Sequence, residues 1–129
     1  MATLTPTLTL VSTDAFTHQP IKISVTDSLS IVAPYTDLSR IAAGTSLTPI
    51  LATTQAVVTY VYLRHTGLLA ENGNETTNLV TVENATSGEG IATLAAGEFM
   101  FLPLKASEGL SVKTETAAAF IEYIYFSKA

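Results

Sequence analysis

Hydrophobic and hydroxyl side chains alternate almost from the N-terminus. Leucine or proline occupies the even positions of residues 4–10, and threonine occupies the odd positions of residues 3–9. A period of two residues is typical of a half-buried β-strand. Pro6 indicates an edge strand, because proline has no N–H group for the hydrogen-bond ladder. Since edge strands pair readily with other chains, we expect residues 1–12 to be an edge or arm strand that contributes to contacts between subunits.

The other hydrophobic residues gather in short runs that are separated by turn residues. Residues 56–64 form the clearest run, with high β-propensity and no glycine or proline. Residues 35–43 are ambiguous between one helical turn capped by Asp37 and a short strand, and residues 44–55 are expected to form a loop. Further strands are expected at residues 21–25, 29–33, 79–83, 91–94, 98–104, 110–113 and 118–126.

The regular spacing of these runs, without any long helical period, predicts the fold class. We expect an all-β chain of about eight strands, arranged as an antiparallel sandwich or barrel rather than an α/β fold. Eight strands suit a jelly-roll-like sandwich, although the order of the strands in the sheets is not written in the sequence. A length of 129 residues fits one domain, so we expect a single β domain spanning residues 1–129.

The composition narrows the function classes. Only 13% of the residues are charged and the net charge is -5, whereas about 25% charged residues is usual for a globular domain. No basic patch or stripe is present, which argues against a nucleic-acid partner. The N-terminus lacks the features of a signal peptide, and no apolar run has the length of a membrane helix. A surface rich in Thr, Ser and Ala suits a protein that neighbours cover, so we expect a homo-oligomer.

Candidate chemistry is sparse. There is no cysteine, and a zinc site needs about three or four nitrogen or sulfur ligands, so His18 and His65 are expected to be surface loop residues. No Gly-x-Ser-x-Gly motif is present. We therefore predict no enzyme activity, no catalytic residue, no cofactor and no metal site. The acidic residues nearest to a calcium-binding pattern are expected to be solvated loop residues, and they are Glu71, Glu75, Glu83 and Glu89.

Two Tyr-x-Tyr pairs are the most distinctive aromatic feature. Both rings of a pair lie on the same face of a strand, and the two pairs would stack across a sheet if their strands were neighbours. Such a face suits a partner subunit or a sugar, or it forms the edge of the core. The candidate interface residues are therefore Leu4, Pro6, Leu8, Leu10, Tyr60, Tyr62, Tyr123 and Tyr125.

Four segments carry a resemblance to a known group of proteins. They are residues 8–14, 23–27, 96–105 and 121–123, and their patterns are those of strands and turns rather than of a reaction centre. With these segments the chain resembles small virion structural proteins of tailed bacteriophages, especially of cyanophages. The resemblance spans most of the chain.

This resemblance implies a head decoration (cement) protein that is present in many copies on the capsid surface of the virion. The expected partners are further copies of the chain, with a trimer favoured, and the major capsid protein. No direct contact with nucleic acid or membrane is expected. The alternative is a tail, baseplate or head-fibre module that binds a host-surface glycan or receptor through the tyrosines or residues 71–90.

Overall fold

The computed structural model describes residues 1–129 and contains twelve strands and no helix. The chain therefore contains no helix that is long and apolar enough to cross a membrane. Every strand pairing is antiparallel, which confirms the predicted all-β antiparallel class. The chain divides into two compact units. Unit 1 comprises Met1–Val32 with Lys128–Ala129, and unit 2 comprises Ala33–Ser127.

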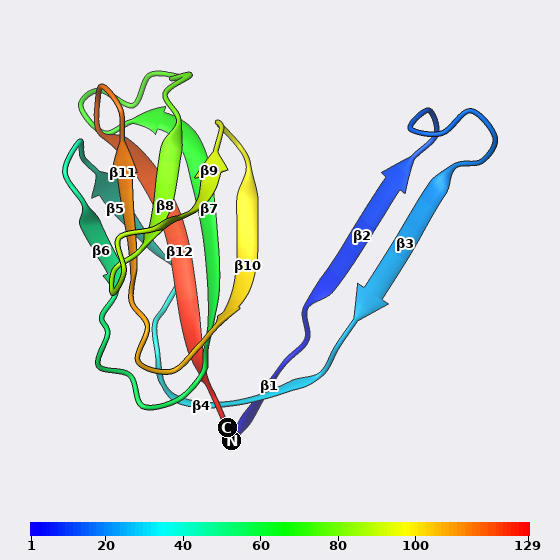
Figure 1. The fold of residues 1–129 in the computed structure, drawn as a ribbon, viewed down its shortest axis with the longest axis horizontal. Helices are drawn as coiled ribbons and strands as arrows, with labels where there is room; N and C mark the ends of the chain where they lie inside the picture. The colour runs from blue at the N-terminus through cyan, green and yellow to red at the C-terminus, as the bar shows by residue number, and fades with distance from the viewer. The chain divides into compact units, whose positions relative to one another are not determined.

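Unit 1 contains short paired strands (Figure 1). They are β1 (Ala2–Leu4), β2 (Thr7–Ser12), β3 (Ile21–Thr26) and the first residues of β4 (Leu29–Tyr35). β1 pairs with β4, and β2 pairs with β3. The alternating N-terminal segment thus forms strands as predicted, but it is divided into two at Thr5 and Pro6. The chain ends meet in this unit, because the N–H of Ala129 donates to the Ser30 carbonyl at 2.9 Å.

Unit 2 contains eight further strands and the end of β4. They are β5 (Ser39–Ala43), β6 (Thr48–Leu51), β7 (Thr59–Leu69), β8 (Val80–Asn84), β9 (Gly90–Leu94), β10 (Phe99–Leu104), β11 (Leu110–Thr114) and β12 (Ala119–Lys128). One sheet has the order β5-β12-β7-β10, and the other has the order β6-β11-β8-β9. The end of β4 also lies beside β12, since the N–H of Thr36 donates to the Tyr125 carbonyl at 3.1 Å.

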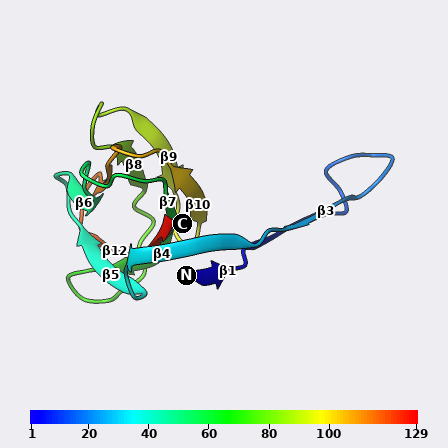
Figure 2. The same cartoon turned by 90° about the horizontal axis from the view of Figure 1, so that it is seen from below.

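This strand order is that of a jelly roll, as predicted. The pairs β8·β9, β7·β10, β6·β11 and β5·β12 are nested, as in one long hairpin that turns between β8 and β9. Rolling that hairpin adds the pairs β7·β12 and β8·β11 and divides the eight strands equally between two sheets. The strands surround a central core when they are viewed at right angles to Figure 1 (Figure 2).

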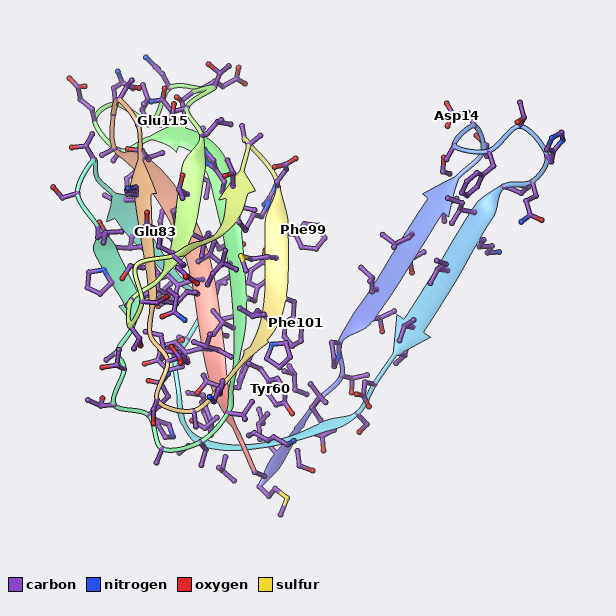
Figure 3. All side chains as sticks on the ribbon, viewed as in Figure 1. Asp14, Tyr60, Glu83, Phe99, Phe101 and Glu115 are labelled. Carbon is purple, nitrogen blue, oxygen red and sulfur yellow. The ribbon has the colours of Figure 1, made fainter.

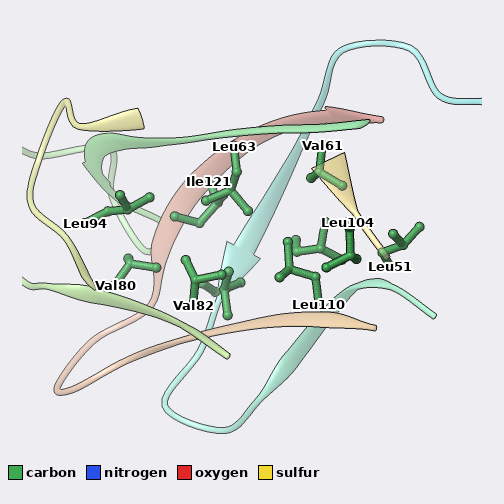
Figure 4. Packing of buried hydrophobic residues seen from close by; sticks show 12 residues of the cluster. Leu51, Val61, Leu63, Val80, Val82, Leu94, Leu104, Leu110 and Ile121 are labelled. Carbon is green, nitrogen blue, oxygen red and sulfur yellow. The ribbon is translucent and has the colours of Figure 1, made fainter. Parts of the chain in front are cut away.

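The core is formed by the inward side chains of both sheets (Figure 4). Leu63 and Ile121 come from the first sheet, Val82 and Leu110 come from the second, and all four have no exposed surface. Successive side chains of a strand point to opposite faces, so each strand buries alternate residues. The same alternation along β7 leaves Arg64 exposed between the buried residues Leu63 and His65.

Two local predictions were settled by pairing between distant segments. Residues 39–43 are a strand rather than a helical turn, because β5 pairs with β12. The prediction of a loop over residues 44–55 was wrong for Thr48–Leu51, which forms β6 against β11. Pro49 makes this run a poor central strand, but β6 is an edge strand, where a missing N–H is tolerated.

His65 is also placed differently from the prediction. β7 continues five residues beyond the predicted end at Arg64, and His65 is fully buried within it rather than in a surface loop. Its Nδ1 accepts a hydrogen bond from the N–H of Gly67 at 3.0 Å, and its Nε2 lies 2.8 Å from the Asn78 carbonyl. A neutral ring with the proton on Nε2 satisfies both contacts. His65 therefore fixes the end of the β7–β8 connection to the sheet.

Replacing His65 with leucine should destabilise the protein by about 2–4 kcal/mol, because the buried N–H of Gly67 and the partly buried carbonyl of Asn78 would each lose a partner. Urea unfolding measures this change as a lower midpoint. His18→Leu is the matched control, since His18 is exposed and should leave the midpoint unchanged. Equal midpoints for the two variants would contradict this role of His65.

Candidate assembly surfaces

The first candidate surface is a two-stranded ribbon in unit 1, which we define as residues 7–26. β2 and β3 pair only with each other, beginning with Thr7 opposite Thr26. The pairing of β1 with β4 continues the same register, with Leu4 opposite Leu29. The ribbon and the β1–β4 pair therefore form one antiparallel hairpin with a local interruption.

The ribbon is amphipathic. Directly opposed residues of an antiparallel pair share a face, so the register assigns each side chain to one face or the other. The apolar face consists of Leu8, Leu10, Ile21, Ile23 and Val25, and Ser12 lies at its end opposite Ile21. The opposite face consists of Thr7, Thr9, Val11, Lys22, Ser24 and Thr26. On that face the hydroxyl oxygens of Thr7 and Thr26 lie 3.1 Å apart, which is hydrogen-bond distance.

The apolar face of the ribbon is open to solvent. Leu8, Leu10, Ile23 and Val25 are 46%, 49%, 46% and 56% exposed. A two-stranded hairpin is at best marginally stable in water when nothing packs against it. A face on which four of the five apolar side chains are about half exposed is therefore expected to contact another surface.

The second candidate surface lies on the outer face of a sheet in unit 2. The register places Phe101 opposite Tyr62 and Tyr62 opposite Ile124, so these residues form a row across β10, β7 and β12. The labelled Phe99 and Phe101 rings extend from β10 in Figure 3. They are 59% and 40% exposed, which is unusual for phenylalanine.

Aromatic contacts extend this row. The rings of Tyr60 and Phe101 stack with their centroids 6.1 Å apart, and those of Tyr35 and Phe126 lie 6.4 Å apart. Tyr35 is itself 55% exposed. We name the whole surface the aromatic face. It consists of Tyr35, Tyr62, Phe99, Phe101, Ile124 and Phe126, and the buried Tyr60 ring supports it through its contact with Phe101.

Charged residues share one row with Phe99, which lies opposite Arg64 of β7. Glu122 of β12 lies opposite Arg64 of β7 and opposite Arg40 of β5. The hydroxyl of Tyr62 donates to Oε1 of Glu122 at 3.0 Å. Burial of the phenol, and then this hydrogen bond and the negative charge of Glu122, raise the pKa of Tyr62 above its usual value of 10.0. The guanidinium of Arg40 lies 5.3 Å from the centre of the Phe120 ring, and this cation–π contact holds the Arg40 side chain beside the row.

The predicted stacking of the two tyrosine pairs across the sheet was wrong. β7 and β12 are neighbours, but Tyr123 lies opposite Leu63 and Tyr125 lies opposite Val61. Tyr123 and Tyr125 therefore share the inner face with buried core residues and pack against the core. Tyr60 and Tyr62 lie on the outer face, so the four rings do not form one surface.

The predicted N-terminal residues are divided in a similar way. Leu8 and Leu10 lie on the exposed apolar face of the ribbon. Leu4 is half-buried and pairs in β1, and Pro6 is half-buried in the interruption, where its carbonyl accepts the N–H of Asp27 at 3.1 Å. Whether any of these residues contacts another molecule stays a prediction.

The sequence itself carries a signal for the exposure of Phe99 and Phe101. Phe99, Phe101 and Pro103 alternate with Met100 and Leu102 along β10, so both faces of this strand are apolar. A strand with two apolar faces in an otherwise sandwich-like pattern either lies between two layers or presents one face to a partner. Which face is outside follows only from the register with β7.

The four acidic residues that come nearest to a calcium-binding pattern do not lie together. Glu71, Glu75 and Glu89 are exposed, and Glu83 forms an ion pair with Lys113 at 3.0 Å. No group of three or more histidine and carboxylate side chains is placed to hold a metal ion. A shallow depression of about 550 Å³ lies between residues 66–68, 75–77 and 96–97, and none of the four predicted tyrosines lines it.

Proline marks several edges of the strand assemblies. β4 contains Pro34, β6 contains Pro49 and β10 contains Pro103. β6 and β10 are edge strands, so Pro49 and Pro103 each leave an edge with one N–H group fewer, which hinders further strands from pairing there. The ribbon strands β2 and β3 contain no proline within their six residues.

Comparison with known proteins identified no relative. The chain matches no family model, no curated protein and no solved structure.

The contact between Tyr62 and Glu122 predicts a measurable pH effect. Replacing Glu122 with glutamine removes the negative charge, so the pKa of Tyr62 should fall toward 10 and stay raised by burial alone. Because folding favours the neutral phenol, its contribution to stability is complete below pH 10 and is lost as the pH rises through the raised pKa. Tyrosine absorbance follows the titration, and Tyr62→Phe identifies the step.

Glu115→Gln is the matched control, because Glu115 is exposed and has no contact with Tyr62. It should leave the titration as it is in the unaltered chain. An unchanged Tyr62 step in the Glu122→Gln variant would show that this carboxylate does not act on the phenol.

Proposed function

We propose that this chain is a virion structural protein that decorates and stabilises the capsid of a tailed bacteriophage. In this role it lies on the capsid surface, forms a homo-oligomer for which a trimer is favoured, and binds the major capsid protein. It acts by contact alone, without a catalytic residue, cofactor, nucleic acid or membrane. The observation that carries the proposal is the presence of two exposed apolar surfaces, the ribbon and the aromatic face, on a chain with only 13% charged residues.

The energy available from these surfaces suits assembly by many weak contacts. Fully burying a Leu, Ile or Val side chain contributes about 1.5–3 kcal/mol, so the four half-exposed residues of the ribbon offer about 3–6 kcal/mol before the entropic cost of association. One such contact alone is weak. Repetition over a symmetric shell multiplies weak contacts through high effective concentration.

The fold is compatible with this role. Jelly rolls recur in viral capsid and lectin domains. A fold hosts many functions, so this support is an analogy at the level of the fold. The stronger support is local, because Phe99 and Phe101 are exposed and do not line the depression beside residues 75–77, and such exposed apolar side chains suit a protein contact.

The alternative function is a tail, baseplate or head-fibre module that binds a host-surface glycan or receptor. It ranks second because the four tyrosines do not form one surface and do not line the depression beside residues 75–77. Retention of the purified chain on a host-cell surface or a glycan array would favour this alternative.

Phage particles that lack this protein should release DNA at a lower temperature than complete particles. The reason is that each removed copy takes away contacts that hold neighbouring capsid subunits together. DNA release on heating and after osmotic shock measures the effect, and adding the purified protein back should restore it. A Glu115→Gln protein is the add-back control and should restore resistance fully, since this exposed residue lies outside the ribbon and the aromatic face.

Equal heat and osmotic resistance of particles with and without the protein would contradict the cementing role.

A further inference from the structure

We propose that Asn72, in the connection between β7 and β8, is a site of spontaneous deamidation, and that the fold of this connection selects it over the other asparagines. The four asparagines of the chain are Asn72, Asn74, Asn78 and Asn84, and only Asn72 is followed by glycine. The modification needs no enzyme, and water is its only co-reactant. The inference goes beyond the proposed function and does not depend on it.

The reaction exchanges one covalent bond for another. The backbone nitrogen of Gly73 loses its proton to solvent and attacks Cγ of Asn72. The new N–Cγ bond closes a succinimide ring, the Cγ–Nδ2 bond breaks, and the Nδ2 group takes up a proton and leaves as ammonia. Water then adds to either carbonyl carbon of the ring and opens it. The product is aspartate or isoaspartate, so the chain gains one carboxylate, and nothing is oxidised or reduced.

The backbone at the tip of the connection leaves the reacting nitrogen accessible. Asn72 and Gly73 are both exposed. Gly73 has a φ of 72°, in the left-handed region that favours glycine. Apart from its chain neighbours, no atom lies within 4 Å of the position that a Cβ on Gly73 would take. The turn therefore favours the residue type that leaves its own nitrogen unhindered.

A side-chain hydrogen bond keeps the two reacting atoms close together. The N–H of Asn74 donates to Oδ1 of Asn72 at 2.9 Å. This Asx turn closes a small ring that contains both Cγ of Asn72 and the nitrogen of Gly73. Holding the two atoms in one ring reduces the entropy that is lost in reaching the attack geometry. The Nδ2 group of Asn72 donates no hydrogen bond within the chain and is free to leave.

One backbone hydrogen bond restrains the reaction. The N–H of Gly73 donates to the Leu69 carbonyl at 2.9 Å, and the N–H of Leu69 donates to the Asn74 carbonyl at 2.8 Å. The nitrogen of Gly73 can attack only while the first of these bonds is open. Exposed hydrogen bonds at the tip of a loop open locally, with a free energy far below that of global unfolding. The fold therefore slows the reaction at Asn72 without preventing it.

Asn84 provides a protected counterpart within the same chain. Its Oδ1 also accepts a hydrogen bond from a backbone N–H two residues on, that of Thr86 at 2.8 Å. Its Nδ2, however, donates to Oε2 of Glu108 at 2.9 Å, and the N–H of Ala85 donates to the Gly109 carbonyl at 2.9 Å. Residues from a second turn thus hold both the leaving group and the attacking nitrogen, and Ala85 has a Cβ beside that nitrogen.

Deamidation changes both the charge and the shape of this connection. The new carboxylate lies between the exposed Glu71 and Glu75, and no lysine or arginine occurs in residues 65–104 to offset it along the chain. Isoaspartate also adds its Cβ atom to the main chain, which disturbs the hydrogen bonds between Leu69 and residues 73–74. Residues 75–77, which follow directly, line the depression described above. The modification therefore alters the loop that forms one wall of this depression.

Incubation of the purified chain at mildly alkaline pH and physiological temperature tests the site. Anion-exchange chromatography should show a more acidic form that increases with time, because each modified chain gains a negative charge. Peptide mass mapping should place aspartate and isoaspartate at position 72, with roughly tenfold more product than at any other asparagine. Asn72→Gln should remove the acidic form, because its side chain would have to close a larger ring. Asn74→Gln is the matched control and should leave the acidic form unchanged.

The Ala85→Gly variant separates the effect of the fold from that of the neighbouring glycine. It places a glycine after Asn84, whose Nδ2 remains bonded to Glu108. Asn84 should then still react several-fold more slowly than Asn72 in the same sample, and at the same rate as Asn72 once the chain is unfolded in urea. Equal rates at the two positions in the folded variant would overturn the proposal. So would a folded chain whose Asn72 stays intact while the urea-unfolded chain is modified.

Discussion

Side chains of a β-strand alternate between its two faces, so two packed sheets bury one face of each strand and leave the other outside. In this protein the inner faces supply a complete core, in which Leu63, Val82 and Ile121 have no exposed surface. The outer faces are not uniformly polar. Phe99 and Phe101 are exposed on one strand of the sandwich, and the ribbon presents a further apolar face. The chain therefore has more apolar faces than its core can bury. The proposed assembly follows from this constraint.

The low charge of the chain fits the same constraint. A monomer usually keeps exposed apolar patches small and surrounds them with charge, whereas a subunit of an assembly relies on its neighbours for cover. Proline in the edge strands β6 and β10 limits pairing there, so the faces of the sheets are better placed than these edges to make contacts. The ribbon combines an apolar face with a face of hydroxyl groups, which can remain in water when the apolar face is covered.

Much of the fold could be predicted from the sequence because it depends on local patterns. The alternation of leucine and threonine near the N-terminus and the β-branched run of β7 each indicated a strand, and the number and spacing of such runs indicated a jelly-roll-like sandwich. The short run of β6 was missed, because its strand character comes from pairing with β11 rather than from its own residues. His65 was missed for a similar reason, since its hydrogen bonds join it to Gly67 and Asn78 in the folded chain.

The candidate surfaces were less predictable, because they depend on the register between distant strands. The sequence placed both rings of each Tyr-x-Tyr pair on one face, but only the register of β7 with β12 showed that the two pairs lie on opposite faces. Likewise, both faces of β10 are apolar, and the pairing with β7 decides that Phe101 is outside.

Amide hydrogen exchange of the ribbon at several protein concentrations tests the central claim most directly. A bare two-stranded ribbon opens easily, so its amides should exchange rapidly in dilute protein and become protected as copies cover one another. The account predicts that protection of Leu8–Leu10 and Ile23–Val25 rises with concentration, while that of the buried Leu63 stays constant. Protection of the ribbon that does not depend on concentration would contradict assembly through this surface.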